Sequence, residues 1–83
     1  MKIELYQRVV LLKDIPEEDL QAGDILTVVE ELPATAESQG EEGFALEAFN
    51  ALGETKAVVF VPKSFVRSLE SDEIYHIRKL ACL

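Results

Sequence analysis

The feature that most constrains the fold is a series of five short runs in which β-branched, aromatic and other apolar residues predominate or alternate with polar ones. Such runs are typical of strands, and residues that favour turns separate them. We therefore predict strands at 5–13, 25–32, 43–50, 55–61 and 66–69. Short strands at this regular spacing indicate a mainly β protein, folded as a small five-stranded antiparallel barrel. Closure of the barrel would leave few unpaired strand edges.

The segments between the runs have their own local signals. Pro16 fits the first position of a short helical turn, where its missing N–H group costs nothing. Gly53 can adopt a positive φ in a short hairpin loop. Pro62 ends the fourth strand because it cannot donate to the ladder, and we expect Lys63–Phe65 to form a single 3₁₀ turn. Residues 33–42, small and acidic without periodicity, are predicted to be a loop.

The end of the chain, residues 71–83, has a different pattern. Ser71 can cap a helix, acidic residues follow it, and basic residues come near the end, which suits the helix dipole. Apolar residues recur at helical spacing, namely Ile74, Ile77 and Leu80 or Ala81. We predict a barrel domain over 1–70 and a short C-terminal helical extension over 71–83. A sixth strand is the alternative, because Tyr75, Ile77 and Lys79 also alternate with their neighbours.

Charge limits the classes of partner. The formal net charge is −8, and no Lys or Arg occurs between Lys13 and Lys56. Nucleic-acid affinity depends on cations that neutralise phosphates, so we expect no nucleic-acid partner and no anionic membrane surface. An acidic surface of this kind favours a basic partner, although such surfaces often serve only solubility.

The sequence also suggests a compartment. Cys82 is the single cysteine, so no disulfide can form within the chain, which fits a reducing environment. The first residues lack the apolar run of a signal peptide, and no segment approaches the length of a membrane helix. We predict a cytoplasmic protein.

Residues suited to catalysis or metal binding are few. His76 and Cys82 are six positions apart and do not share one helical face. No Cys/His cluster suits zinc, and the acidic segment 14–19 lacks the alternating ligands and the glycine of a calcium loop. Neighbouring carboxylates such as Glu30 and Glu31 point to opposite faces of a strand. We predict no enzyme activity, no catalytic residue, no metal and no cofactor.

A family resemblance rests on two motifs, Val-Val-Leu-Leu-Lys-Asp-Ile-Pro-Glu-Glu-Asp-Leu at 9–20 and Gly-Asp-Ile-Leu-Thr-Val-Val-Glu at 23–30. It continues in Ala-Leu-Glu-Ala-Phe, Gly-Glu-Thr-Lys-Ala-Val-Val and Val-Arg-Ser-Leu, which begin at positions 45, 53 and 66. Over residues 5 to about 70, the chain resembles the small bacterial family called domain of unknown function 4926. The pattern of that family usually has Asp in place of Gln7 and Gly in place of Leu26.

The resemblance implies an SH3-like β-barrel and a prokaryotic source, and it implies no activity. Members of the family are often encoded beside another small protein, which suggests an antitoxin-like or immunity-like binding role by analogy.

Together these observations predict a non-enzymatic module that binds a protein, and the acidic surface favours a basic one. Its surface would combine acidic residues with aromatic anchors, among which Tyr6 is a further candidate. The residues predicted to contact the partner are Glu17, Glu18, Asp19, Glu30, Glu31, Phe44, Glu47 and Phe49. The alternative is a homo-oligomeric structural protein assembled through its tail, with Ile74, Ile77 and Leu80 at the interface.

Overall fold

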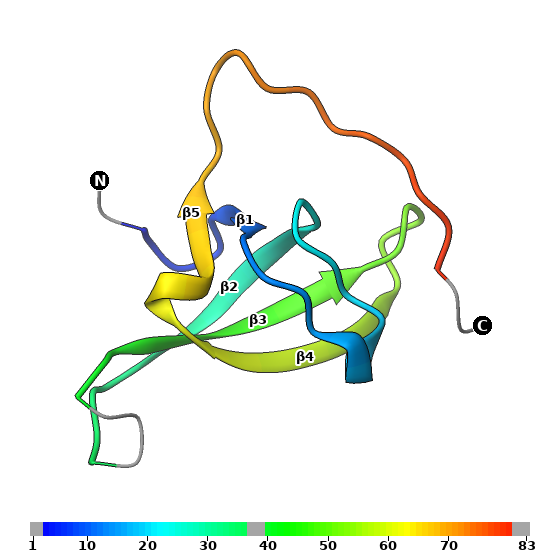
Figure 1. Cartoon of the computed structure of the whole chain (residues 1–83). Coiled ribbons are helices and arrows are strands. Elements are labelled where there is room, and N and C mark those ends of the chain that lie inside the picture. Colours follow the sequence, from blue (N-terminus) through cyan, green and yellow to red (C-terminus); the bar gives the residue numbers. More distant parts are fainter. Residues whose placement is uncertain (1–2, 37–39, 81–83) are drawn as a thin grey trace.

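Antiparallel pairing joins all the strands of this chain into one sheet, as Figure 1 shows. The structure is a computed structural model, and it describes residues 3–36 and 40–80. The strands are β1 (Arg8–Leu11), β2 (Ile25–Leu32), β3 (Gly43–Phe49), β4 (Thr55–Pro62) and β5 (Val66–Ser68), with two 3₁₀ turns, η1 (Pro16–Glu18) and η2 (Lys63–Phe65). The predicted five antiparallel strands are confirmed, and so are the helical turn at Pro16 and the 3₁₀ turn after Pro62.

The prediction of a closed barrel is wrong. The strand order is β4-β3-β2-β1-β5, so β4 and β5 are the two edges of an open sheet. Closure would require β4 and β5 to pair with each other, but Pro62 offers no N–H group and η2 separates the two strands. With only three residues, β5 pairs with β1 alone.

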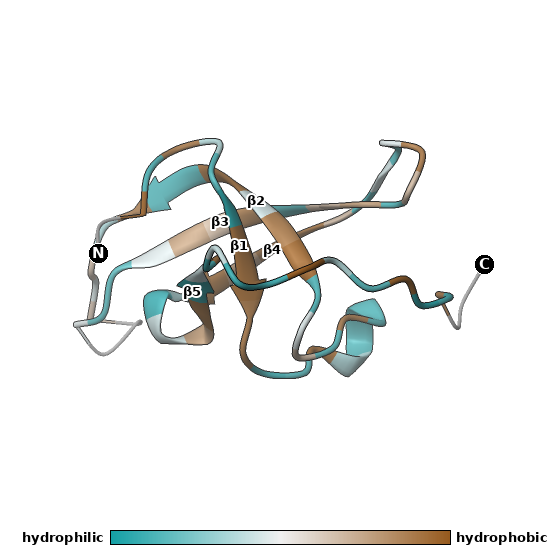
Figure 2. Cartoon of the chain, turned by 90° about the horizontal axis from the view of Figure 1, so that it is seen from above, coloured by the Kyte–Doolittle hydropathy of each residue, from teal (hydrophilic) through white to brown (hydrophobic). Residues whose placement is uncertain are grey.

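The core lies on the inner face of this bent sheet. Its fully buried large side chains come from β1, β2 and β3, and they are Val9, Leu11, Leu26, Val28, Phe44 and Leu46. Val59 and Val61 of β4 face the same core because they lie opposite Leu46 and Phe44. Figure 2 shows that apolar residues dominate the strands, while polar residues dominate η1 and the turns.

A β-bulge in β2 changes which residues face the core. Val28 lies opposite Leu46, but the register then shifts, so that Glu30 lies opposite Ala45 and Glu31 opposite Phe44. A simple alternation along β2 places Leu32 on the same face as Val28. The extra residue of the bulge moves Leu32 to the outer face, because one inserted position reverses the direction of every later side chain.

The predicted C-terminal helix is also wrong over the part that the structure describes. Residues 71–72 form a turn, and residues 73–80 continue without helix or strand as the long arch in Figure 1. Residues 81–83 of the predicted helix lie outside the described residues. Helices this short are marginal without tertiary support, and β-branched residues such as Ile74 and Ile77 disfavour them further. The sixth strand considered as an alternative is likewise not found at 73–80.

Candidate functional site

Two apolar side chains of β4 point away from the core. Phe60 is 69% exposed and Val58 is 48% exposed, whereas Val59 and Val61 of the same strand are buried. The register places Phe60 opposite Ala45, and Val58 opposite Glu47. Large apolar side chains that lie together on a surface often mark a contact site for another molecule.

Carboxylates lie in the same cross-strand rows. One row runs across three strands from Glu30 through Ala45 to Phe60, and the next runs from Thr27 through Glu47 to Val58. We call these residues the outer β2–β4 face, defined as Thr27, Glu30, Ala45, Glu47, Val58 and Phe60. Glu47 accepts a hydrogen bond from the hydroxyl of Thr55, whereas Glu30 is exposed and has no ion pair within the described part of the chain. Apolar contact area beside carboxylates suits lysine or arginine side chains, which combine an aliphatic stem with a cationic end.

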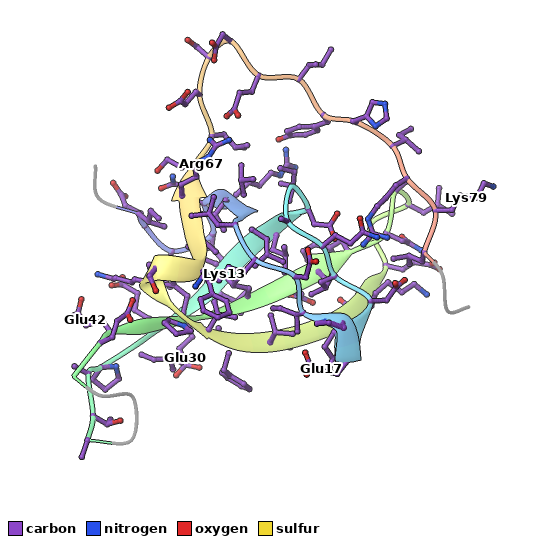
Figure 3. The ribbon with its side chains drawn as sticks, viewed as in Figure 1. Lys13, Glu17, Glu30, Glu42, Arg67 and Lys79 are labelled. Carbon is purple, nitrogen blue, oxygen red and sulfur yellow. The ribbon has the colours of Figure 1, made fainter. Side chains whose placement is uncertain are left out.

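The other residues predicted to contact a partner are spread over the molecule. Glu17 and Glu18 lie on η1, and Figure 3 shows Glu17 well apart from Glu30 along the sheet. Asp19 ends η1 in the left-handed conformation, and its carbonyl oxygen accepts a hydrogen bond from Arg78. The predicted acidic residues therefore do not form one continuous face.

The predicted aromatic anchors differ in how accessible they are. Phe44 is fully buried and belongs to the core, so it offers no surface to a partner. Glu31 lies opposite Phe44 at an exposed end of the sheet. Phe49, at the end of β3, is exposed. Tyr6 is 73% exposed and has a positive φ of 65°, with its N–H group bonded to the carbonyl of Val28.

Sequence reasoning missed Phe60 and Val58 as surface residues. Their alternation with Val59 and Val61 was visible in the sequence, but it did not show which set faced the core. The deciding observation is the register, which places Val61 opposite Phe44 on the inner face. The sequence did contain a cue. Both alternating sets of side chains in β4 are apolar, and because successive side chains point to opposite faces, only one set can face the core.

A second notable region is the tail of residues 69–80, which side chains fasten to the sheet at three points. Arg67 holds Glu73 through two hydrogen bonds of 2.9 and 2.5 Å, and Arg8 donates to the Tyr75 hydroxyl at 3.3 Å. Arg78 binds the carboxylate of Asp24. The tail thereby covers the outer face at the β1–β5 end of the sheet and leaves the outer β2–β4 face uncovered.

Beneath the tail lies an open hollow of about 390 Å³. Its floor is the cross-strand row of Ile25, Val10 and Arg67, and its wall is the tail from Leu69 to Tyr75. Within the tail, Ile74 is 93% exposed and Ile77 is 84% exposed, while Leu80 is half-buried. Apolar and polar residues line the hollow in similar numbers, and its one cation, Arg67, already holds Glu73.

The ion pairs of the tail shift the pKa values of its carboxylates. The hydrogen bond from Arg67 lowers the pKa of Glu73 to about 2, and the backbone N–H of Glu70 contributes to the same effect. Partial burial raises the pKa of Asp24. Hydrogen bonds from Arg78 and from the N–H of Gln21, together with the charge of Arg78, outweigh that effect and hold the pKa of Asp24 below its usual range.

Within residues 3–36 and 40–80, no group of three or more His, Cys, Asp or Glu side chains is placed to hold a metal ion. His76 is exposed, and Cys82 lies outside the described residues. Over the same part of the chain, no helix has the length and apolar character needed to cross a membrane.

Comparison with known families agrees with the resemblance seen in the sequence. A family model described as "Domain of unknown function (DUF4926)" matches residues 5–68. The chain belongs to this family. The match includes all five strands and ends at residue 68, so the tail of residues 69–80 lies outside the matched part. No curated protein and no solved structure matches the chain.

Proposed function

We propose that the chain is a non-enzymatic protein-binding module that holds a basic partner on its outer β2–β4 face. The observation that carries the proposal is the exposure of Phe60 and Val58 in the same rows as Glu30 and Glu47. The apolar side chains supply contact area, and the carboxylates select for cations and disfavour anionic partners. An antitoxin-like or immunity-like role, in which a small acidic protein binds a basic one, would use such a surface.

The net charge of −8 supports a basic partner. Lys63, just after β4, pairs with Glu42 at 2.6 Å, whereas Lys56, within β4, is exposed and forms no ion pair in residues 3–36 and 40–80. A partner that approaches this face would meet mainly carboxylates, so the association rate should fall as salt rises. We further infer a bacterial, cytoplasmic protein with an SH3-like arrangement of strands, and these three inferences rest on the sequence and on the family resemblance.

The test is co-purification of the tagged full chain from its own source at low and at high salt. We expect a basic protein to be retained at low salt and to be released at high salt. The Phe60→Ser variant should lose it, whereas Leu52→Ser, which alters an exposed apolar residue in the β3–β4 hairpin, should retain it. Retention of the same partner by Phe60→Ser, or the absence of any salt-sensitive partner, would contradict the proposal.

A second candidate function is self-assembly through the tail. It is favoured by the near-complete exposure of Ile74 and Ile77, which nothing within the described chain covers. Light scattering of the full chain would then give a mass above that of one chain. The double variant Ile74→Ser/Ile77→Ser would give the monomer mass, and a monomer in both samples would exclude this function.

A further inference from the structure

The free edge of β4 offers unpaired backbone groups beside the outer β2–β4 face. Strand β4 pairs with β3 on one side, and no strand lies on its other side. The N–H of Lys63 donates to the carbonyl of Glu42 at 2.9 Å, which fixes the phase of the hydrogen bonds along this ladder. Because hydrogen-bonded pairs alternate in an antiparallel ladder, Val61 and Val59 direct their backbone groups to β3, while Val58 and Phe60 direct theirs outward.

Hydrogen bonds on the opposite side of the sheet confirm this phase. Val28 donates its N–H to the carbonyl of Gln7, in the segment before β1, so the backbone groups of Val28 point toward β1. Neighbouring residues of a strand direct their backbone groups to opposite sides, so those of Thr27 point toward Glu47 of β3. Leu46, next to Glu47, must then face β4. In the ranges 3–36 and 40–80, no backbone hydrogen bond from a loop reaches Val58 or Phe60.

This edge is open over only a short length. Lys56 places a charge near its start, and Pro62 removes an N–H group at its end. Both are features by which natural sheets limit uncontrolled pairing along an edge. The open part of the edge is therefore residues 57–61. It contains Val58 and Phe60, which have both exposed apolar side chains and outward-directed N–H and carbonyl groups. The other edge strand, β5, has three residues and leads directly into the tail.

We propose that the edge of β4 receives an extended segment of the partner as a sixth strand of the sheet. This inference rests on the proposed function and names the way in which the partner is held. The backbone of the partner would bond to the N–H and carbonyl groups of Val58 and Phe60. Its side chains on the outer side would lie beside the same two residues.

Charge selects the chemistry of that segment. A cationic side chain placed next to Val58 lies two strands from Glu47, about 10 Å at the usual strand spacing, and the two long side chains together can span this distance. An aliphatic stem would pack on Val58, and a guanidinium or ammonium group could lie on the ring of Phe60. The segment should therefore alternate cationic with small or apolar residues. A second copy of this chain is disfavoured, because each copy has a net charge of −8.

The test uses the full chain and a defined probe, a seven-residue peptide in which lysine and valine alternate. We expect the probe to slow hydrogen exchange of the Val58 and Phe60 amides, measured by NMR, and to lose affinity as salt rises. A peptide methylated on alternate backbone nitrogens should bind at least tenfold more weakly, because it lacks the N–H donors that the edge requires. A peptide with glutamate in place of lysine should not bind.

A pair of protein variants gives a second readout. Val58→Pro removes one outward N–H group that the ladder to β3 does not use, and it should weaken binding of the probe about tenfold. Val58→Thr keeps that N–H group and should bind within about threefold of the wild type. Amide spectra of both variants would show whether the sheet is retained, and the exchange data on the wild-type chain do not depend on either variant.

The outcomes separate this inference from the proposed function. The lysine–valine peptide and its N-methylated form could bind equally well and shift signals of the outer β2–β4 face without protecting the Val58 and Phe60 amides. In that case strand addition is wrong and the proposed binding face stands. If the lysine peptide does not bind and no basic partner is found by co-purification, both proposals are wrong. If the two amides become protected as the protein concentration rises without peptide, a second copy is the occupant and the proposed basic segment is wrong.

Discussion

Arg78 and Asp24, which are 54 positions apart in the sequence, form a two-pronged ion pair. The Nε of Arg78 lies 2.9 Å from one carboxylate oxygen of Asp24, and Nη2 lies 2.6 Å from the other. The same guanidinium donates to the carbonyl of Asp19 at 2.7 Å. Asp24 also accepts the N–H of Gln21 at 2.8 Å, so one carboxylate organises both the turn before β2 and the end of the tail.

Replacement of Arg78 by Gln should release the tail. Paired hydrogen bonds between a guanidinium and a carboxylate are among the stronger polar contacts, but this pair is only half-buried, so we expect a loss of about 1 kcal/mol in the free energy of unfolding. The larger effect should be local. Chymotrypsin should cleave after Tyr75 several times faster in Arg78→Gln than in the wild type. Lys79→Gln removes the same charge from an exposed neighbour and is the control; equal cleavage rates in the two variants would contradict this role for Arg78.

The ion pair between Arg67 and Glu73 should make stability depend on pH in the acid range. The pKa of Glu73 is lowered from 4.5 to about 2 in the folded chain, so the unfolded chain binds a proton at a higher pH than the folded chain does. The stabilisation is therefore fully present above about pH 5 and is lost as the pH falls toward 2. Urea unfolding of the wild type and of Glu73→Gln should differ at pH 6 and converge by about pH 2.

Glu18→Gln is the matched control for this measurement. Glu18 is an exposed carboxylate on η1 with no ion pair inside the described ranges, so its replacement should leave the pH profile of the wild type unchanged. A constant difference between wild type and Glu73→Gln from pH 6 to pH 2 would show that the carboxylate does not titrate as the structure requires.

The strands could be predicted from the sequence because their signals are local. Alternation within a few residues, together with Pro16, Gly53 and Pro62 at the turns, indicates where the five strands lie, although β1 is Arg8–Leu11 and thus shorter than the predicted 5–13. Gly53 has the expected positive φ of 84°, and the side chain of Asn50 accepts the N–H groups of Leu52 and Glu54 across the hairpin. These are contacts between residues close in the sequence, which a pattern can encode.

The features that were predicted wrongly depend on residues far apart in the sequence. The helical spacing of Ile74 and Ile77 is real, but Glu73 and Arg78 bond to Arg67 and Asp24 instead of supporting a helix. The candidate site had the same difficulty. Phe44 is buried because it lies opposite Val61 in the ladder between β3 and β4, and this register is not visible in either strand alone.

Gly43 is required at the start of β3 by close approach of the backbone. A Cβ atom at this position would lie 2.6 Å from the carbonyl oxygen of Val61, which is too close for any real contact. Gly43→Ala should therefore destabilise the fold by about 1–3 kcal/mol, measured by urea unfolding, because the two strands would have to separate. Gly53→Asn tests a different requirement, since Gly53 has open space and a positive φ that asparagine tolerates. Gly53→Asn should lower the free energy of unfolding clearly less than Gly43→Ala does. Equal losses would contradict the close approach between Gly43 and the backbone of Val61.

Leu26 of β2 is one of the fully buried residues of the core. Here the side chain is 1% exposed and belongs to the core cluster, and the backbone irregularity of β2 occurs two residues later, between Val28 and Glu30. Leu26→Ala should lower the free energy of unfolding by about 2–5 kcal/mol, because it leaves a cavity at the centre of a small core. The total free energy of unfolding of a protein is only about 5–15 kcal/mol, so the variant should be close to unfolding.

The matched control for Leu26 is Leu52→Ala, the same substitution at an exposed position in the β3–β4 hairpin. It should change the free energy of unfolding by less than about 0.5 kcal/mol. A larger loss for Leu26→Ala than for Leu52→Ala would show that the Leu26 side chain is needed to fill the core. Equal losses would mean that the sheet relaxes around the missing side chain.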